Sequence, residues 1–157
     1  AEAGAGPIVL ERGYDADTRA AAVELYRSTG KLDTECNVQF GEGGAGTFSD
    51  GKLTTGIRDE RIGWVLRRLV DFGAPEEITF LAKPHIGTDK LRECVKALRR
   101  RVEALGGEVK FGAKFSGFTA ENGRISQVEY IQGGKVSNIR TDSMILSELC
   151  STLTKLS

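Results

Sequence analysis

Histidine and cysteine are scarce in this 157-residue chain, which contains one histidine, His85, and three cysteines, Cys36, Cys94 and Cys150. The cysteines lie far apart, form no C-x-x-C pair and cannot build a Cys/His zinc site with a single histidine. Their odd number also disfavours a disulfide framework. We therefore expect no metal site and a reduced, cytoplasmic setting.

An excess of charge of either sign is also absent, because 22 lysines and arginines balance 22 aspartates and glutamates. This balance indicates neither a nucleic-acid partner nor an anionic membrane surface. No apolar run is long enough to cross a bilayer, no secretory signal opens the chain, and no repeat is visible. With 39% hydrophobic residues, the chain falls in the range of one soluble globular domain.

What the sequence does contain is a glycine-rich segment at residues 37–52, NVQFGEGGAGTFSDGK, in which five of sixteen residues are glycine. Gly41, Gly43 and Gly46 fit the pattern G-x-G-x-x-G. In dinucleotide sites that spacing permits a tight turn and a close approach of the backbone to a pyrophosphate. Without a strand before it and a helix after it, the spacing is only a weak indication of such a site.

A second phosphate-loop pattern overlaps the first, since Gly46, Gly51 and Lys52 fit G-x-x-x-x-G-K. Leu53 follows, however, where a nucleotide hydrolase needs a Ser or Thr for Mg²⁺. Both motifs also require a helix start, and residues 47–56 show no helical apolar period. Two other interpretations remain open, a flexible glycine-rich hairpin and a long loop whose N–H groups surround a large anionic ligand.

The first two thirds of the chain predict one buried parallel strand, at residues 7–13, and several helices. Each helix has an N-cap and a closing glycine: Asp15 and Gly30, Asp59 and Gly73, Thr88 and Gly106. The apolar face of the second helix comprises Ile62, Val65, Leu66, Leu69 and Val70. The apolar face of the third comprises Leu91, Val95, Leu98, Val102 and Leu105. Residues 1–6 read as the last turn of a further helix. The run Arg99, Arg100, Arg101 is interpreted as a solvated helix face rather than a binding patch.

Beyond Gly107 the apolar period changes to two, which predicts strands at residues 108–111, 114–119, 124–131 and 135–140. Asn122-Gly123 and Gly133-Gly134 are typical hairpin turns. Residues 144–146, Met-Ile-Leu, predict a last short strand. The order of helix, parallel strand and meander is typical of the α/β class.

Four segments together carry a resemblance to a known family: PIVLERG at residues 7–13, VQFGEGGAGTFSDGKL at 38–53, KPHIGTD at 83–89 and LGGEV at 105–109. Over residues 1–146 the chain resembles the uncharacterised FAD-dependent dehydrogenases of the glutathione-reductase-type flavoprotein superfamily. In that family the first strand and its glycine turn precede the strand that ends in glutamate. The resemblance therefore implies a partial Rossmann-like fold that binds FAD or NAD(P). It leaves three alternatives: the chain is a fragment, its ends have rearranged, or another chain supplies the missing central strand in a homo-oligomer.

The resemblance implies that Glu11 accepts hydrogen bonds from the adenosine ribose of FAD, and that the glycine-rich loop lies along the pyrophosphate and flavin. The implied cofactor-binding residues are Glu11, Arg12, Gly41, Gly43, Gly44, Gly46, Thr47, Phe48, Ser49, Asp50, Gly51, Lys52 and Phe115. Glu11 could otherwise be a surface residue at a strand end, and Phe115 could be core. NAD(P)H is the implied electron donor or acceptor.

His85 is the candidate catalytic acid, because the pKa of an unperturbed imidazole lies near neutrality. The sequence favours a structural role over a catalytic one, since no partner for this single histidine is visible. We expect a fragment of an FAD-dependent oxidoreductase that acts on a small molecule. The alternatives are an inactive nucleotide-binding or interaction fragment and, less favoured, an NTPase.

The expected organisation is a single partial FAD-binding domain over residues 1–157. Its parts are a strand ending in Glu11 with a helix (1–30), the cofactor loop (31–57), helices with a parallel strand (58–112), a β-meander with a last strand (113–147) and an atypical tail (148–157).

Overall fold

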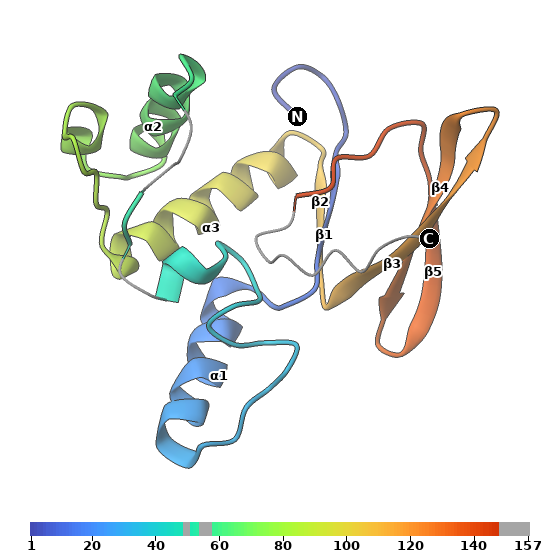
Figure 1. Ribbon diagram of the computed structural model, residues 1–157, viewed down its shortest axis with the longest axis horizontal. Coiled ribbons are helices and arrows are strands. Elements are labelled where there is room, and N and C mark those ends of the chain that lie inside the picture. The colour runs from blue at the N-terminus through green and yellow to red at the C-terminus, as the bar shows by residue number, and fades with distance from the viewer. Residues whose placement is uncertain (49–50, 54–57, 148–157) are drawn as a thin grey trace. The chain divides into compact units, whose positions relative to one another are not determined.

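The computed structural model describes residues 1–48, 51–53 and 58–147 (Figure 1). The chain divides into two compact units, residues 1–113 and residues 114–157. The described residues form a two-stranded parallel sheet, a three-stranded sheet and three α-helices. The α/β class expected from the sequence is therefore confirmed. Among these residues, no helix combines the length and the apolar character that crossing a membrane requires.

The first unit is built on strands β1 (Ile8–Glu11) and β2 (Glu108–Phe111). They pair in parallel, with Ile8 opposite Glu108 and Glu11 opposite Phe111. The predicted parallel strands are therefore confirmed. Their pairing joins segments about a hundred residues apart, and it brings the carboxyl end of β1 beside the end of β2.

Helix α1 (Ala16–Thr29) follows β1 and has the predicted ends. The Asp15 carboxylate accepts hydrogen bonds from the N–H groups of Asp17 and Thr18, and Gly30 closes the helix in the left-handed conformation at φ 72°. These contacts satisfy backbone groups that a helix end otherwise leaves unpaired. Both caps were readable from the sequence because they involve only neighbouring residues.

Helices α2 (Arg61–Asp71) and α3 (Thr88–Ala104) form where the sequence predicts them, but their first turns differ from the prediction. Asp59 lies one residue before the N-cap position, and its carboxylate still accepts from Arg61 N at 2.8 Å. The prediction that Thr88 caps α3 is wrong. Gly87 is the N-cap, at φ 82°, and no side chain caps the helix. A built Cβ on Gly51 would lie 2.9 Å from Gly87 N, so the backbone of residue 51 packs against this turn.

The core of the first unit lies between α2, α3 and the short 3-10 helix η2 (Glu76–Thr79). Its buried members are Ala74, Ile78, Ile86, Leu91 and Cys94. The predicted apolar faces of both helices contribute partly buried residues such as Leu66, Leu69, Val95 and Leu98. Cys94, which is fully buried, was not among the predicted core residues.

The second unit is a meander of β3 (Ala113–Glu121), β4 (Arg124–Gln132) and β5 (Lys135–Arg140), in that order across the sheet. Strands β4 and β5 are antiparallel. Both predicted hairpin turns are confirmed, with φ of 52° and 77° at Asn122-Gly123 and of 57° and 75° at Gly133-Gly134. Positive φ at both central residues matches the right-handed twist of the flanking strands.

Two predicted elements at the ends of the described chain do not form. Residues 144–146 are not a strand, and Ile145 is 94% exposed. An apolar run of three residues becomes a strand only where a neighbouring strand pairs with its backbone. At the other end, Gly4 N donates to Ala1 O at 2.9 Å in a single turn, and residues 1–7 contain no helix.

Candidate functional site

The carboxyl end of β1 presents a glutamate beside the glycine-rich loop. Glu11 Oε1 accepts a hydrogen bond from Gly13 N at 2.7 Å, while Oε2 accepts none from the described residues. Gly13 is buried, and a built Cβ there would lie 2.5 Å from Gly41 Cα. Only glycine fits at this contact, so the loop backbone is held directly against the end of the strand.

The loop that follows α1 is fastened by Arg19, which is fully buried. Its guanidinium donates to Asn37 O at 2.8 Å, Val38 O at 2.6 Å and Glu42 O at 2.8 Å. Burial lowers the pKa of Arg19, and the negative charge of Glu11 opposes this change. The rigid fork of the guanidinium suits several carbonyls at once, so one side chain shapes residues 37–42.

Sequence reasoning did not find Arg19. The available signal was its position, because Arg19 shares a helix face with Ala16 and Val23, both of which are buried. A charged residue within an apolar helical stripe indicates a buried polar contact. The partner carbonyls could not be inferred, since the loop that provides them has no periodic pattern.

Arg12, an implied cofactor-binding residue, is engaged by other side chains. It forms an ion pair with Glu35, with Arg12 Nη2 at 2.9 Å from Glu35 Oε1, and its guanidinium lies 4.3 Å from the centre of the Phe40 ring. Hydrogen bonding to Glu35 raises the pKa of Arg12. In this arrangement Arg12 holds the end of β1 against the loop.

Glu42 is a buried carboxylate at the centre of the loop. Its Oε2 accepts from Ala16 N at 2.8 Å, and its Oε1 accepts from Arg99 Nε at 2.8 Å. The Arg99 guanidinium also lies 5.5 Å from the centre of the Phe111 ring. The interpretation of residues 99–101 as a solvated face is therefore wrong for Arg99, whose charge is paired inside the fold.

The central glycines of the loop adopt conformations that other residues rarely reach. Gly41, Gly43 and Gly44 have φ of 123°, 84° and 65°. They lead into the short 3-10 helix η1 (Ala45–Phe48). In the described residues after Gly46 no α-helix begins before α2, as the sequence predicted, although this 3-10 turn was not foreseen. The loop therefore lacks the long helix that a standard phosphate loop has behind it.

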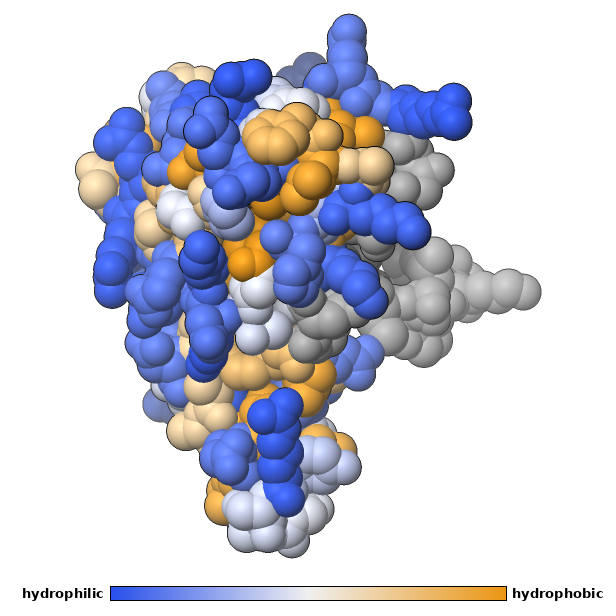
Figure 2. All heavy atoms as spheres, turned by 90° about the vertical axis from the view of Figure 1, so that its left-hand side faces the viewer, coloured by the Kyte–Doolittle hydropathy of each residue, from blue (hydrophilic) through white to orange (hydrophobic). Residues whose placement is uncertain are grey.

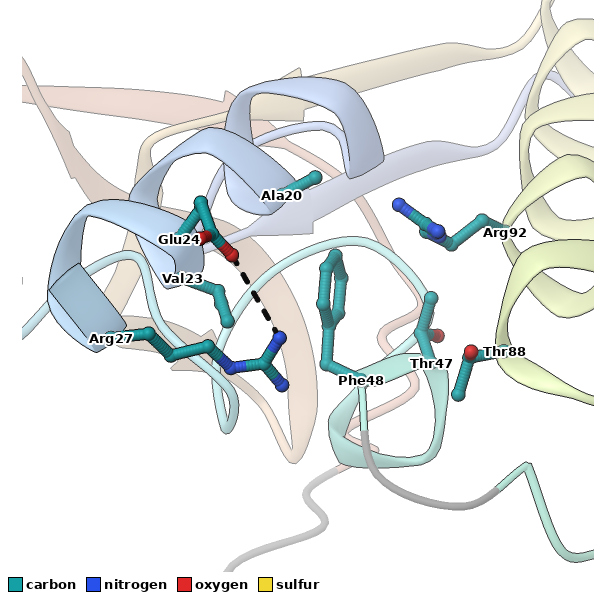
Figure 3. Close-up of a pocket in the computed structure, with 8 residues that line it drawn as sticks. All are labelled: Ala20, Val23, Glu24, Arg27, Thr47, Phe48, Thr88 and Arg92. Carbon is teal, nitrogen blue, oxygen red and sulfur yellow. Dashed lines mark ion pairs between the residues drawn. The ribbon is translucent and has the colours of Figure 1, made fainter.

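Thr47 and Phe48 line a pocket of about 390 Å³ between α1 and the first turn of α3. Figure 3 shows the Phe48 ring lying between side chains of α1 and the Arg92 side chain of α3. Arg27 pairs with Glu24 at 4.0 Å, and the Arg92 guanidinium lies 5.6 Å from the Phe48 ring centre. Arg92 is also ion-paired, with Asp89. The pocket beside the glycine loop thus holds two guanidinium groups, each with a carboxylate partner, whose remaining N–H groups can bind an anionic group such as a phosphate.

The structure brings Lys52 and His85 together through an antiparallel bridge. Ile86 N donates to Gly51 O and Leu53 N donates to Pro84 O, both at 3.0 Å. His85 is exposed, and its imidazole has no hydrogen bond to a described residue. No described side chain therefore orients the imidazole by a hydrogen bond, and the catalytic role of His85 stays a prediction.

The remaining implied residues divide into three cases. Gly46 lies in η1 without a positive φ. Ser49 and Asp50 lie outside the described residues. Phe115 is half-buried on β3, in the second unit. In the described part of the chain, no group of three or more His, Cys, Asp or Glu side chains could hold a metal ion.

Comparison with known proteins gives one informative similarity. The chain is 47% identical over 141 residues to an uncharacterized protein of Clostridium beijerinckii. The match covers 90% of this chain and 26% of that protein, so the chain spans about a quarter of the length of the curated relative. No family model matches the chain.

Proposed function

We propose that this chain is part of an FAD-dependent oxidoreductase and that Glu11 binds the adenosine ribose of the cofactor. The supporting observation is the Glu11 carboxylate at the carboxyl end of β1. One of its oxygens is fixed by Gly13 N, and the other accepts no hydrogen bond from the described residues. A carboxylate in that place on a parallel sheet suits two ribose hydroxyls, and its charge disfavours a 2′-phosphate.

The glycine loop supports the same proposal. Gly44 and Gly46 have open space where a Cβ would be, so a ligand can approach the backbone there. Arg27 and Arg92 line the pocket beside Thr47 and Phe48. Glu24 and Asp89 balance their charges, and their remaining N–H groups suit the phosphates of FAD. Among the residues of this chain, Glu11 would hold the ribose and the loop would hold the phosphates.

When bound, FAD would supply the transfer of hydride or electrons, with NAD(P)H as the donor or acceptor. The protein would contribute binding and orientation. His85, which the antiparallel bridge brings beside the cofactor-binding candidate Lys52, is the proposed residue on the side of the small-molecule substrate. The imidazole of His85 is exposed, so a substrate can reach it.

The test is an NMR titration of the ¹⁵N-labelled chain with millimolar FAD, which detects even weak binding. We expect weak affinity and shifts that concentrate at Gly13 and residues 41–48. Glu11→Ala should reduce affinity ~10- to 150-fold, which corresponds to roughly 1.5–3 kcal/mol for charge-assisted hydrogen bonds. The FAD affinity of Glu11→Gln should lie between those of the unmodified chain and Glu11→Ala, since the amide keeps one acceptor oxygen. Glu77→Gln, in the exposed first turn of η2, is the matched control.

A second measurement uses the Clostridium beijerinckii relative at full length. We expect the purified protein to show flavin absorbance, or to gain it when reconstituted with FAD. The proposal fails if that protein binds no flavin, or if Glu11→Ala and Glu77→Gln bind FAD with the same affinity as the unmodified chain.

A further inference from the structure

A second cavity, of about 630 Å³, lies in the first unit beside α2. Its walls come from α2, from the segment at residues 81–84 and from Leu53. The apolar side chains that line it are Leu53, Ile62, Val65, Leu66, Leu69 and Leu81. This volume is within the range of small-molecule sites in proteins, which is roughly 300–1,000 Å³.

The apolar character of the cavity continues onto the surface. Val65 is 48% exposed and Leu81 is 50% exposed, and their chain neighbours Trp64 and Phe80 are 61% and 72% exposed. Figure 2 shows this side of the molecule, where apolar side chains gather between hydrophilic ones. Single exposed apolar side chains are ordinary, but Val65 and Leu81 line the same cavity, and exposed apolar side chains at one hollow mark a binding surface.

The charges at the rim indicate which ligand would enter. Arg61 Nη2 lies 2.5 Å from Asp59 Oδ2, so these two charges neutralise each other. Lys83 also lines the cavity, is exposed, and makes no ion pair with any described residue. Among the described residues that line the cavity, Lys83 therefore provides a positive charge without a paired carboxylate beside an apolar interior.

We propose that this cavity binds an amphipathic organic acid, with an aliphatic body between α2 and Leu81 and its carboxylate at Lys83. The hydrogen bond from Leu53 N to Pro84 O places one wall next to the bridge between Lys52 and His85. The acid would thus lie beside the only histidine of the chain. This binding does not depend on FAD.

The first test measures affinity by the fluorescence of Trp64, the only tryptophan of the chain, and by methyl NMR shifts of Val65, Leu66 and Leu81. The probes are hexanoate, octanoate and decanoate below their micelle concentrations, and the neutral alcohol decanol. We expect each added methylene to raise affinity up to about fourfold, the factor for burying one CH₂ group. Decanoate should bind about 3- to 5-fold more tightly than decanol at low salt, the factor for an exposed ion pair.

Variants separate the apolar and the charged parts of the site. Lys83→Gln should remove the preference for decanoate over decanol, whereas Lys90→Gln, an exposed lysine outside the cavity lining, should keep it. Val65→Glu should weaken decanoate binding more than about tenfold, because it adds a like charge to the wall. Val136→Glu, on an exposed position of β5, is its control. Circular dichroism checks that every variant is folded.

Three results would overturn the inference. The first is equal affinity for decanoate and decanol in the unmodified chain. The second is a set of methyl shifts that lies outside the cavity. The third is a dimer, detected by light scattering, whose interface covers these methyl groups and which none of the ligands dissociates. In that case this face would be an interface between copies of the chain.

Discussion

Arg99 Nε donates to Glu42 Oε1 at 2.8 Å, and this contact ties the glycine loop to the middle of α3. The side chain of Glu42 is 8% exposed and that of Arg99 is 22% exposed. Because Glu42 also accepts from Ala16 N, one carboxylate joins the loop, α1 and α3. A loop with few apolar side chains is thereby positioned by charge and hydrogen bonds rather than by hydrophobic packing.

We predict that Glu42→Ala lowers the free energy of unfolding by about 3 kcal/mol or more, because it leaves the Arg99 charge without its buried partner. Glu103→Ala is the matched control, since Glu103 contacts the same guanidinium from an exposed position at 3.7 Å and should cost less than about 1 kcal/mol. Urea unfolding measures both. The double variant Glu42→Ala/Arg99→Met should lose less free energy of unfolding than the two single variants lose together. If the two losses simply add, the contact between Glu42 and Arg99 is contradicted.

The glycines of the loop should differ sharply in their tolerance of alanine. A built Cβ on Gly43 would lie 2.1 Å from Thr47 Oγ1, and the φ of Gly43 is 84°. Gly43→Ala should therefore lower the free energy of unfolding by about 2 kcal/mol or more. Gly46 has neither a positive φ nor a nearby atom. Gly46→Ala should stay within about 1 kcal/mol of the unmodified chain, on the stabilising side. Equal thermal stability of the two variants would show that the loop geometry is different from that described.

The N-cap of α1 should make stability depend on acid pH. Burial alone would raise the pKa of Asp15, but hydrogen bonds from the Thr18 hydroxyl and from the N–H groups of Thr18 and Asp17 outweigh it, and the pKa lies below its usual range. The native state therefore holds the ionised form more strongly than the unfolded state. This stabilisation is present above about pH 4, the unfolded pKa, and is lost as the pH falls through the lower native value.

Asp15→Asn tests this dependence, because asparagine still caps a helix but does not titrate in this range. In urea-unfolding series, we expect the unmodified chain to have a larger free energy of unfolding than Asp15→Asn at pH 6. This difference should disappear as the pH is lowered toward about 3. Asp71→Asn, on an exposed residue at the end of α2, is the control. If the difference in free energy of unfolding between the unmodified chain and Asp15→Asn stays constant with pH, the prediction is contradicted.

The two described cysteines should react slowly with thiol reagents. Cys36 is 2% exposed and Cys94 is fully buried, and burial raises the pKa of both thiols. Few thiolates are therefore present at neutral pH, and the reagent cannot reach them. With Cys150→Ser to remove the third thiol, we expect reaction with DTNB to be roughly 100-fold slower in the native chain than in urea. Comparable rates in both states would contradict the burial of these side chains.

Local signals in the sequence determined most of the secondary structure. Asp15 and Gly30 bound α1, and Asn122-Gly123 and Gly133-Gly134 form the two hairpin turns, because caps and turns depend only on residues within a few positions. Strand β1 was readable from an apolar run before Gly13, and β2 was readable from the apolar alternation that follows Gly107. The strand predicted at residues 144–146 was wrong, because a strand needs a partner and nothing within these three residues specifies one.

Only the tertiary structure decided how the candidate site is assembled. Arg19 binds carbonyls 18 to 23 positions away, and Arg99 binds a carboxylate 57 positions away. No periodic pattern connects such residues, because their contacts depend on where the loop is placed after the helices have packed. The sequence by itself thus determined which residues could form helices, strands and turns. The packing of these elements decided which charges are buried and paired, such as those of Arg99 and Glu42, and which, such as that of Lys83, have no ion pair with a described residue.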